Sequence, residues 1–244
     1  MLKRAFDVAL SLVGFIFLSP VFIVIPIMIK LDSEGPVFFC QKRIGKGLRR
    51  FTMYKFRTMF FNRAPGDITM ADDGRVTRIG KLLRVTKLDE IPQLWNILIG
   101  EMTFVGPRPL LESAVMRFCE DYRVILRDAR PGVTDAASIK YRHESEILGA
   151  CSDPVDFYFR RIMPDKIRLQ KEYLRHQTFL GDIKILWETL AACSRLDIAD
   201  AHAIQPEKVS PMSIGTRETS VAPEVYSRRW SAVSAHGEEP RASN

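Results

Sequence analysis

The chain has 244 residues, 46% hydrophobic and 27% charged, which excludes a wholly disordered or collagen-like protein. Lysine and arginine outnumber aspartate and glutamate by 36 to 29, for a formal net charge of +7. The excess lies entirely in residues 1–200, because residues 201–244 carry five basic and five acidic side chains. It indicates an anionic partner such as nucleic acid, a phospholipid surface or a phosphorylated substrate.

An apolar segment covers residues 8–31, with a single charge, Lys30, near its end. As a straight helix it would be roughly 36 Å long, against about 30 Å for a hydrocarbon core. A signal peptide is disfavoured by the length of the run, which leaves a simple transmembrane span or a helix that enters one leaflet and returns. Ser19-Pro20 interrupts the run, and proline bends helices. Because both flanks are basic and positive charge favours the cytoplasmic side, the pattern favours re-entry.

Residues 37–56 form two extended stretches around a glycine-containing turn at 45–47, which predicts a β-hairpin. The hairpin lies in a segment, residues 40–63, with eight basic and no acidic side chains. The rest of the chain predicts, in order, a helix at 76–85, a helix from 88 to about 100, a helix from 109 to about 127, a turn at 130–134, and helices at 154–173 and 182–193. Beyond residue 200 the composition predicts a disordered tail.

The cysteines are far apart and form no C-x-x-C pair, and they are Cys40, Cys119, Cys151 and Cys193. This spacing disfavours a zinc site, a redox motif and a disulfide framework. We therefore interpret all four as ordinary thiols of a protein in a reducing compartment.

The acidic pair Asp89-Glu90 lies at a predicted helix N-terminus in basic surroundings. One interpretation is helix capping, since acids in the first turn complement the helix dipole. The other is catalysis, in which an ionised carboxylate attacks phosphorus and its neighbour binds a metal ion. Attack on an anionic diphosphate requires neutralisation by Mg²⁺ and by cationic side chains. The candidate cations, each of which is also consistent with a solvated or lipid-facing role, are Lys55, Arg57, Arg84 and Arg108.

Six blocks in order carry a resemblance to a known family. They are Lys3-Arg4-x-Phe6-Asp7, Ser19-Pro20, Gly35-Pro36-x-Phe38-Phe39-x-Gln41-x-Arg43-x-Gly45, Tyr54-Lys55-Phe56-Arg57-Thr58-Met59, Leu88-Asp89-Glu90-x-Pro92-Gln93-Leu94-x-Asn96 and Val105-Gly106-Pro107-Arg108-Pro109. Over about residues 1–197 the sequence resembles the bacterial sugar transferase family, the small monotopic phosphoglycosyl transferases that act as undecaprenyl-phosphate sugar phosphotransferases.

The resemblance implies an α/β fold: a mainly helical monotopic membrane domain with a re-entrant N-terminal helix broken at Ser19-Pro20, a short β-hairpin and amphipathic interfacial helices. It divides the chain into a re-entrant membrane helix at 1–34, a phosphoglycosyl transferase catalytic domain at 35–200 and the tail at 201–244. It also implies a location on the cytoplasmic face of the bacterial inner membrane. The expected partners are therefore inner-membrane lipid and downstream glycosyltransferases, and no nucleic acid.

The resemblance further implies an enzyme that transfers a phosphosugar from a UDP-sugar to a polyprenol phosphate, namely undecaprenyl phosphate, and releases UMP. This is the first step in the assembly of exopolysaccharide, O-antigen or another glycoconjugate. The implied mechanism is ping-pong through a phosphosugar-aspartate, with Asp89 as the nucleophile, Glu90 as its partner and both near Mg²⁺. The substrate-binding residues predicted from the cationic pattern and the matched motifs are Lys55, Arg57, Arg84, Pro107, Arg108 and Asp182.

The chain departs from the family pattern after Thr134, where many members continue with Gly and this one has Asp135-Ala136-Ala137. The departure leaves the acidic pair intact but changes the expected sugar-recognition loop. Two other functions remain as alternatives. One is a membrane-tethered binder of nucleic acid or anionic lipid that uses the basic segment 40–63, and the other is a catalytically dead scaffold for surface-polysaccharide assembly. Release of UMP from a UDP-sugar distinguishes the enzyme from both.

Overall fold

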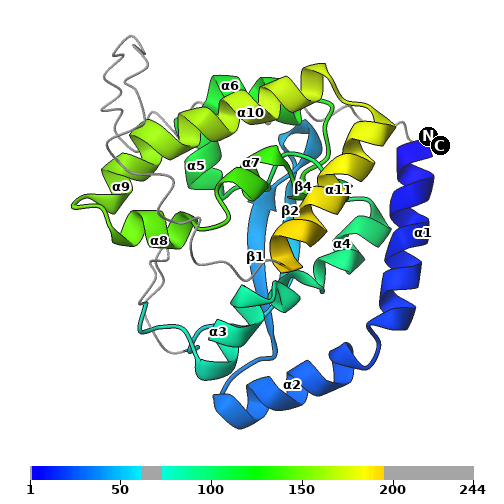
Figure 1. The fold of residues 1–244 in the computed structure, drawn as a ribbon, viewed down its shortest axis with the longest axis vertical. Helices are drawn as coiled ribbons and strands as arrows, with labels where there is room; N and C mark the ends of the chain where they lie inside the picture. The colour runs from blue at the N-terminus through cyan, green and yellow to red at the C-terminus, as the bar shows by residue number, and fades with distance from the viewer. Residues whose placement is uncertain (1, 62–72, 195–244) are drawn as a thin grey trace, which may run out of the picture.

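The computed structural model describes residues 2–61 and 73–194 as a mixed helix and strand fold (Figure 1). The predicted disordered tail at 201–244 and Arg63 of the basic segment lie outside the described residues. In chain order the elements are α1 (Leu2–Phe17), α2 (Val21–Asp32), β1 (Phe38–Ile44), the 3₁₀ turn η1 (Lys46–Leu48), β2 (Arg50–Phe56), α3 (Arg78–Val85), the 3₁₀ turn η2 (Leu88–Glu90), α4 (Gln93–Ile99), β3 (Thr103–Val105), α5 (Glu112–Arg117), α6 (Cys119–Leu126), β4 (Gly132–Thr134), α7 (Ala136–Lys140), α8 (Glu144–Gly149), α9 (Pro154–Phe157), the π-helical turn η3 (Tyr158–Ile162), α10 (Met163–Arg175) and α11 (Phe179–Ser194).

The N-terminal apolar segment folds as two helices, α1 and α2, that are bent by 62° relative to each other. In the part of the chain that the structure describes, neither helix alone is long and apolar enough to cross a membrane, whereas the bent pair together passes on length and composition. Pro20 is the N-cap residue of α2, and the Ser19 hydroxyl donates to the Ile16 carbonyl at 2.8 Å. The predicted break at Ser19-Pro20 is therefore confirmed.

The start of α1 is bonded to the rest of the domain. The Lys3 ammonium donates to Asp182 of α11 at 2.7 Å, and the Tyr173 hydroxyl donates to the other oxygen of the same carboxylate at 2.6 Å. One turn later the buried Asp7 carboxylate accepts from the Thr103 hydroxyl at 2.8 Å. These bonds fix the N-terminus of the bent pair against β3, α10 and α11.

The end of α2 is bonded to the same domain. The guanidinium of Arg57, at the end of β2, donates to the Ser33 carbonyl at 2.7 Å and to the Glu34 carbonyl at 2.6 Å. Asp32 accepts from the backbone N–H of Ile79 in α3 at 3.0 Å. Both ends of the bent pair are thus attached to one folded unit, along whose side and lower edge the pair lies in Figure 1.

The predicted hairpin is confirmed and lies at the centre of the fold (Figure 1). Strands β1 and β2 pair antiparallel, with Phe38 opposite Phe56 and Ile44 opposite Arg50. Alternate residues of β2, Phe51 and Met53, are buried in a core with α4. The hairpin therefore supports the elements that follow it, including the turn that carries the acidic pair.

The turn predicted at 130–134 is wrong in part, because Gly132–Thr134 forms β4, which pairs parallel with β3. Three residues are too few to show the alternation that identifies a strand. The two backbones approach so closely that a Cβ on Gly132 would lie 2.2 Å from the Gly106 nitrogen. Glycine at this position therefore brings the segment Gly106-Pro107 against β4.

Three helix predictions need correction, and two helices were missed. The single helix expected at 109–127 is divided into α5 and α6 at Phe118, whose backbone is non-helical (φ −118°, ψ 40°). The helix expected at 154–173 is interrupted by η3, and α11 begins at Phe179, earlier than the predicted 182. Helices α7 and α8 were not predicted, because segments of five and six residues show no clear apolar period.

Candidate active site

The acidic pair lies in η2, a 3₁₀ turn that precedes α4. Lys87, the N-cap residue of this turn, has a left-handed backbone (φ 57°, ψ 15°), which is unusual for a residue with a side chain. Helix α4 begins only at Gln93, and its N-cap is Pro92, which makes no side-chain capping bond. Asp89 and Glu90 therefore precede α4 and do not cap it, so the capping interpretation is wrong for this helix.

Glu90 is bonded to two cations that come from different parts of the chain. Its Oε1 accepts from the Lys55 ammonium of β2 at 2.8 Å and from the Arg108 guanidinium at 2.7 Å. Burial alone would raise the pKa of Glu90, but the charges and hydrogen bonds of Arg108 and Lys55 outweigh it and hold the pKa well below its usual range. Glu90 is therefore ionised and holds both cations beside Asp89.

The environment of Asp89 differs from that of Glu90. Asp89 is 7% exposed, and its buried Oδ1 has no hydrogen-bond partner among the residues that the structure describes. The Lys55 ammonium lies 4.0 Å from Oδ2. Burial raises the pKa of Asp89, and the Lys55 charge opposes this rise without cancelling it. An unpaired carboxylate oxygen beside cations suits a nucleophile that attacks an anionic group.

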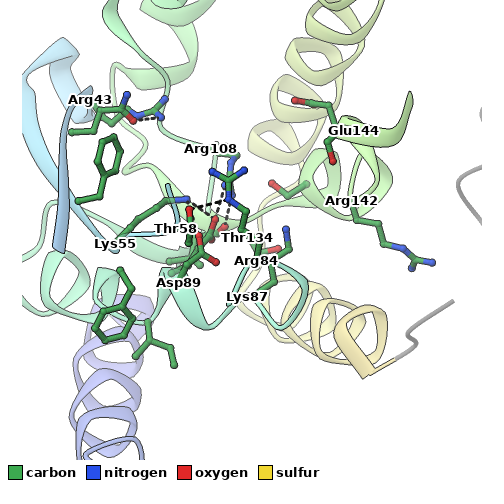
Figure 2. A pocket seen from close by; sticks show the side chains of 18 of the residues that line it. Arg43, Lys55, Thr58, Arg84, Lys87, Asp89, Arg108, Thr134, Arg142 and Glu144 are labelled. Atoms are coloured by element: carbon green, nitrogen blue, oxygen red, sulfur yellow. Dashed lines mark hydrogen bonds and ion pairs between the residues drawn. The ribbon is translucent and has the colours of Figure 1, made fainter. Parts of the chain in front are cut away.

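The pair faces a cleft of ≈ 1740 Å³. The basic residues that line it are Arg43, Lys55, Arg57, Arg75, Arg84, Lys87, Arg108, Arg142 and Lys166. The acidic residues that line it are Asp89, Glu90, Asp135, Glu144 and Glu146. In Figure 2 the side chains of Lys55 and Arg108 approach Asp89, whereas Arg142 points away from it. The excess of positive charge suits an anionic ligand.

Arg84 reaches the cleft from the last turn of α3. Its Nε donates to the Thr58 hydroxyl at 2.9 Å, and burial lowers its pKa. Helix α3 lies directly against the Thr58 backbone, since a Cβ on Gly80 would be 2.1 Å from the Thr58 carbonyl oxygen. The absence of a side chain at Gly80 thus allows α3 to bring Arg84 next to the acidic pair.

The structure brings some of the predicted site residues together and separates others. Lys55 and Arg108 bond Glu90, and Arg84 lines the same cleft. Pro107 is buried behind Arg108, and its carbonyl accepts from the Gly132 N–H at 2.9 Å. Arg57 also lines the cleft, but its guanidinium is bonded to the end of α2. Asp182 does not line the cleft, and its carboxylate is bonded to Lys3 and Tyr173.

Several cleft residues were not predicted as site residues. Lys87 directly precedes the acidic pair, so its position in the sequence was an available signal. Asp135, the departure from the family pattern, is 1% exposed and lines the cleft. Gln170 of α10 lines it as well, and no motif or spacing distinguished this residue. The fold brings these residues to the site through contacts distant in sequence.

The residues of the site fit a Mg²⁺ ion that takes most of its ligands from a substrate. Within residues 2–61 and 73–194, no group of three or more His, Cys, Asp or Glu side chains is placed to hold a metal ion. Mg²⁺ commonly uses one or two carboxylates together with substrate phosphates and water. The buried, unpaired Oδ1 of Asp89 fits such a ligand, whereas Glu90 Oε1 is already bonded to two cations.

The described residues thus combine a bent apolar helix pair with a cationic cleft around a buried carboxylate. The family model described as bacterial sugar transferase matches residues 1–195, and the chain belongs to this family.

Three relatives illustrate the similarity. The undecaprenyl-phosphate glucose phosphotransferase of Komagataeibacter xylinus is 37% identical over 201 residues, which cover 77% of this chain and 35% of the relative. The UDP-N-acetylgalactosamine-undecaprenyl-phosphate N-acetylgalactosaminephosphotransferase of Aeromonas hydrophila is 38% identical, over 78% of this chain and 43% of the relative. The exopolysaccharide production protein ExoY of Sinorhizobium fredii is 32% identical, over 78% of this chain and 84% of the relative. The chain thus spans less than half the length of the first two relatives.

Proposed function

We propose that this protein transfers a phosphosugar from a UDP-sugar to a polyprenol phosphate, with undecaprenyl phosphate as the acceptor, and releases UMP. The observation that carries the proposal is the buried Asp89, whose Oδ1 is unpaired, next to a Glu90 that holds Lys55 and Arg108. The names of the relatives support the same chemistry, since two of them are undecaprenyl-phosphate sugar phosphotransferases. The reaction would begin the assembly of an exopolysaccharide, an O-antigen or another glycoconjugate, with downstream glycosyltransferases as partners.

The first half-reaction uses Asp89 as the nucleophile. A carboxylate oxygen attacks the phosphorus that bears the sugar, an acyl-phosphate bond forms, and the bond from that phosphorus to the bridging oxygen breaks. The bridging oxygen and its electron pair leave as part of UMP. Lys55 and Arg108, held in place by Glu90, stabilise the negative charge that the diphosphate carries in the transition state.

In the second half-reaction a phosphate oxygen of the polyprenol phosphate attacks the same phosphorus. The acyl-phosphate bond breaks, the Asp89 carboxylate is regenerated, and the lipid product is a polyprenol diphosphate sugar. Asp89, with Glu90 beside it, is where Mg²⁺ would be held, and the bound ion would neutralise charge on the diphosphate.

The bent pair α1–α2 supports a re-entrant topology. We place it on the cytoplasmic side of the bacterial inner membrane because both flanks of the apolar segment are basic. Its start is bonded to Asp182 and its end to Arg57, and both partners belong to one folded unit. A helix pair attached to one unit at both ends has both ends on one side of a bilayer. Helix α11 exposes Leu180, Trp187 and Leu190, which suits the predicted role of an interfacial helix.

The test is a burst assay with purified protein in detergent, a panel of UDP-sugars and Mg²⁺, without polyprenol phosphate. We expect release of up to one UMP per protein molecule and a sugar-phosphate mass on the peptide that contains Asp89. Asp89→Asn should abolish both, while Asp128→Asn, which changes a carboxylate in an exposed ion pair, should change neither. A nucleic-acid or lipid binder, or a scaffold, would release no UMP. Normal turnover by Asp89→Asn would refute the covalent route.

A further inference from the structure

Asp135 is a buried carboxylate that is bonded on both oxygens. Its Oδ1 accepts from the Ser138 N–H at 2.6 Å and so caps α7. Its Oδ2 accepts from the Gln170 side-chain amide at 3.0 Å and from the backbone N–H of Arg108 at 3.3 Å. Capping α7 requires only one of these oxygens. The second oxygen therefore connects α10 to the Arg108 backbone, a contact that capping does not explain.

These bonds continue into a chain that reaches the acidic pair. The Tyr122 hydroxyl of α6 donates to Gln170 Oε1 at 3.2 Å, and Tyr122 and Gln170 are 1% and 2% exposed. Gln170 bonds Asp135, Asp135 bonds the Arg108 backbone, and the Arg108 guanidinium bonds Glu90 at 2.7 Å. Buried hydrogen-bond chains whose members are satisfied restrict motion more than isolated bonds do.

The backbone on both sides of Arg108 is itself conformationally restricted. Arg108 lies between Pro107 and Pro109, and proline limits both its own φ and the conformation of the residue before it. The Arg108 guanidinium also donates to the Val133 carbonyl at 3.3 Å, next to β4. Glu90 is the main cause of the raised pKa of the Arg108 guanidinium, and the Asp135 charge adds to it. Arg108 is therefore fixed at its backbone by Asp135 and at its side chain by Glu90 and Val133.

We infer that Asp135 and Gln170 are positioning residues that hold Arg108 in the orientation that binds the diphosphate of the donor. The inference rests on the proposed function, because it takes a UDP-sugar as the ligand of Arg108. It also gives the departure from the family pattern a role: the residue that replaces glycine after Thr134 connects α7 and α10 to the cation nearest Glu90. Neither residue needs to touch the substrate, since both act through Arg108.

The test compares Asp135→Asn with the wild-type protein by the affinity for UDP in the presence of Mg²⁺, measured by calorimetry, and by KM and kcat for UMP release. Asparagine is as good an N-cap as aspartate, so its oxygen keeps the bond to Ser138 while its NH₂ group faces the Arg108 N–H. We expect UDP affinity to fall and KM to rise by about fivefold to tenfold, the order expected for the loss of one hydrogen bond of ordinary strength, because the contact of Asp135 with the Arg108 N–H is long at 3.3 Å. Asp153→Asn is the matched control, because Asp153 caps α9 in the same way without contacting Arg108, and it should change neither value.

A double-mutant cycle separates positioning from general destabilisation. In an Arg108→Met background, where no guanidinium remains to be positioned, Asp135→Asn should have no further effect on UDP affinity. An equal loss in both backgrounds, or unchanged affinity in Asp135→Asn alone, would overturn the inference. Gln170→Met, which removes the amide and keeps the volume, should weaken UDP binding in the same direction and serves if Asp135→Asn does not fold. If the wild-type protein itself does not bind UDP, the proposed function fails and this inference fails with it.

Discussion

Asp89 and Glu90 are neighbours in one turn, yet neutralising them should change the stability of the fold in opposite directions. Burial raises the pKa of Asp89, so its ionisation opposes folding. The stability that its protonated form contributes is present at low pH and is lost as the pH rises through the folded-state pKa. Asp89→Asn should therefore raise the apparent Tm near neutral pH, and the difference from the wild type should narrow as the pH falls.

Glu90→Gln should do the reverse. The two cations lower the pKa of Glu90, so its charge stabilises the fold above the ordinary pKa of glutamate, and this contribution is lost only as the pH falls through the lower folded-state value. Breaking a buried ion pair costs about 3–5 kcal/mol, but the Arg108 side chain is 38% exposed and glutamine keeps one acceptor. We expect a loss of about 2–4 kcal/mol, which for a domain of this size lowers Tm by about 5–10 °C.

The assay is thermal unfolding in detergent, followed by circular dichroism at neutral pH and at about pH 5, which is above the ordinary pKa of glutamate. Glu188→Gln is the control, because Glu188 forms an exposed pair with Lys184 at 3.8 Å and should shift Tm by less than about 2 °C. The reasoning is refuted if both substitutions lower Tm to the same extent. It is refuted equally if Asp89→Asn is the more destabilising of the two.

Two further predictions concern the cation beside Asp89 and the topology of the bent pair. Lys55→Met should slow UMP release about 10²–10³-fold. Because the Lys55 charge lowers the pKa of Asp89, the same substitution should move the acid limb of the pH–rate profile to higher pH. An acid limb that does not move would mean that the Lys55 charge does not act on Asp89. In a cysteine-free background, a cysteine at the exposed Leu2 should resist an impermeant thiol reagent in intact cells, and Pro20→Leu should increase its labelling by straightening the bend. Full labelling without Pro20→Leu would establish a span that crosses the membrane.

Elements with a strong local signal were predictable from the sequence. The hairpin was predictable because extended apolar stretches flank a turn that contains glycine. In this turn Gly47 has φ 64°, a conformation that favours glycine. The break at Ser19-Pro20 was predictable because proline removes a backbone donor wherever it occurs. Helix α3 was predictable from its apolar spacing, and its N-cap, Thr77, accepts from the Gly80 N–H. In each case the information lies within a few residues.

The parts that depend on distant contacts were not predictable. In the pairing of β3 with β4, Thr103 lies opposite Gly132, and the sequence of neither three-residue strand indicates its partner. Asp182 matched a family acid and was assigned to the substrate, yet the fold places it against Lys3, far from it in sequence. Charge alone was enough to propose Lys55 and Arg108 as contacts of the acidic pair. The sequence did not predict that both bond Glu90 and that neither forms a hydrogen bond with Asp89.

The difference between Asp89 and Glu90 follows from the turn that carries them. Successive side chains in a 3₁₀ turn point about 120° apart, so adjacent carboxylates enter different surroundings. Glu90 points to the cations from β2 and from the Pro107-Arg108 step, while one oxygen of Asp89 is buried without a partner. The left-handed backbone of Lys87 at the start of the turn costs about 1–3 kcal/mol and persists because the packed elements around it impose it. The same turn therefore produces one carboxylate that stays ionised and holds two cations, and next to it a carboxylate whose ionisation burial opposes. We propose that the first organises the site and that the second, ionised beside Lys55, is the nucleophile.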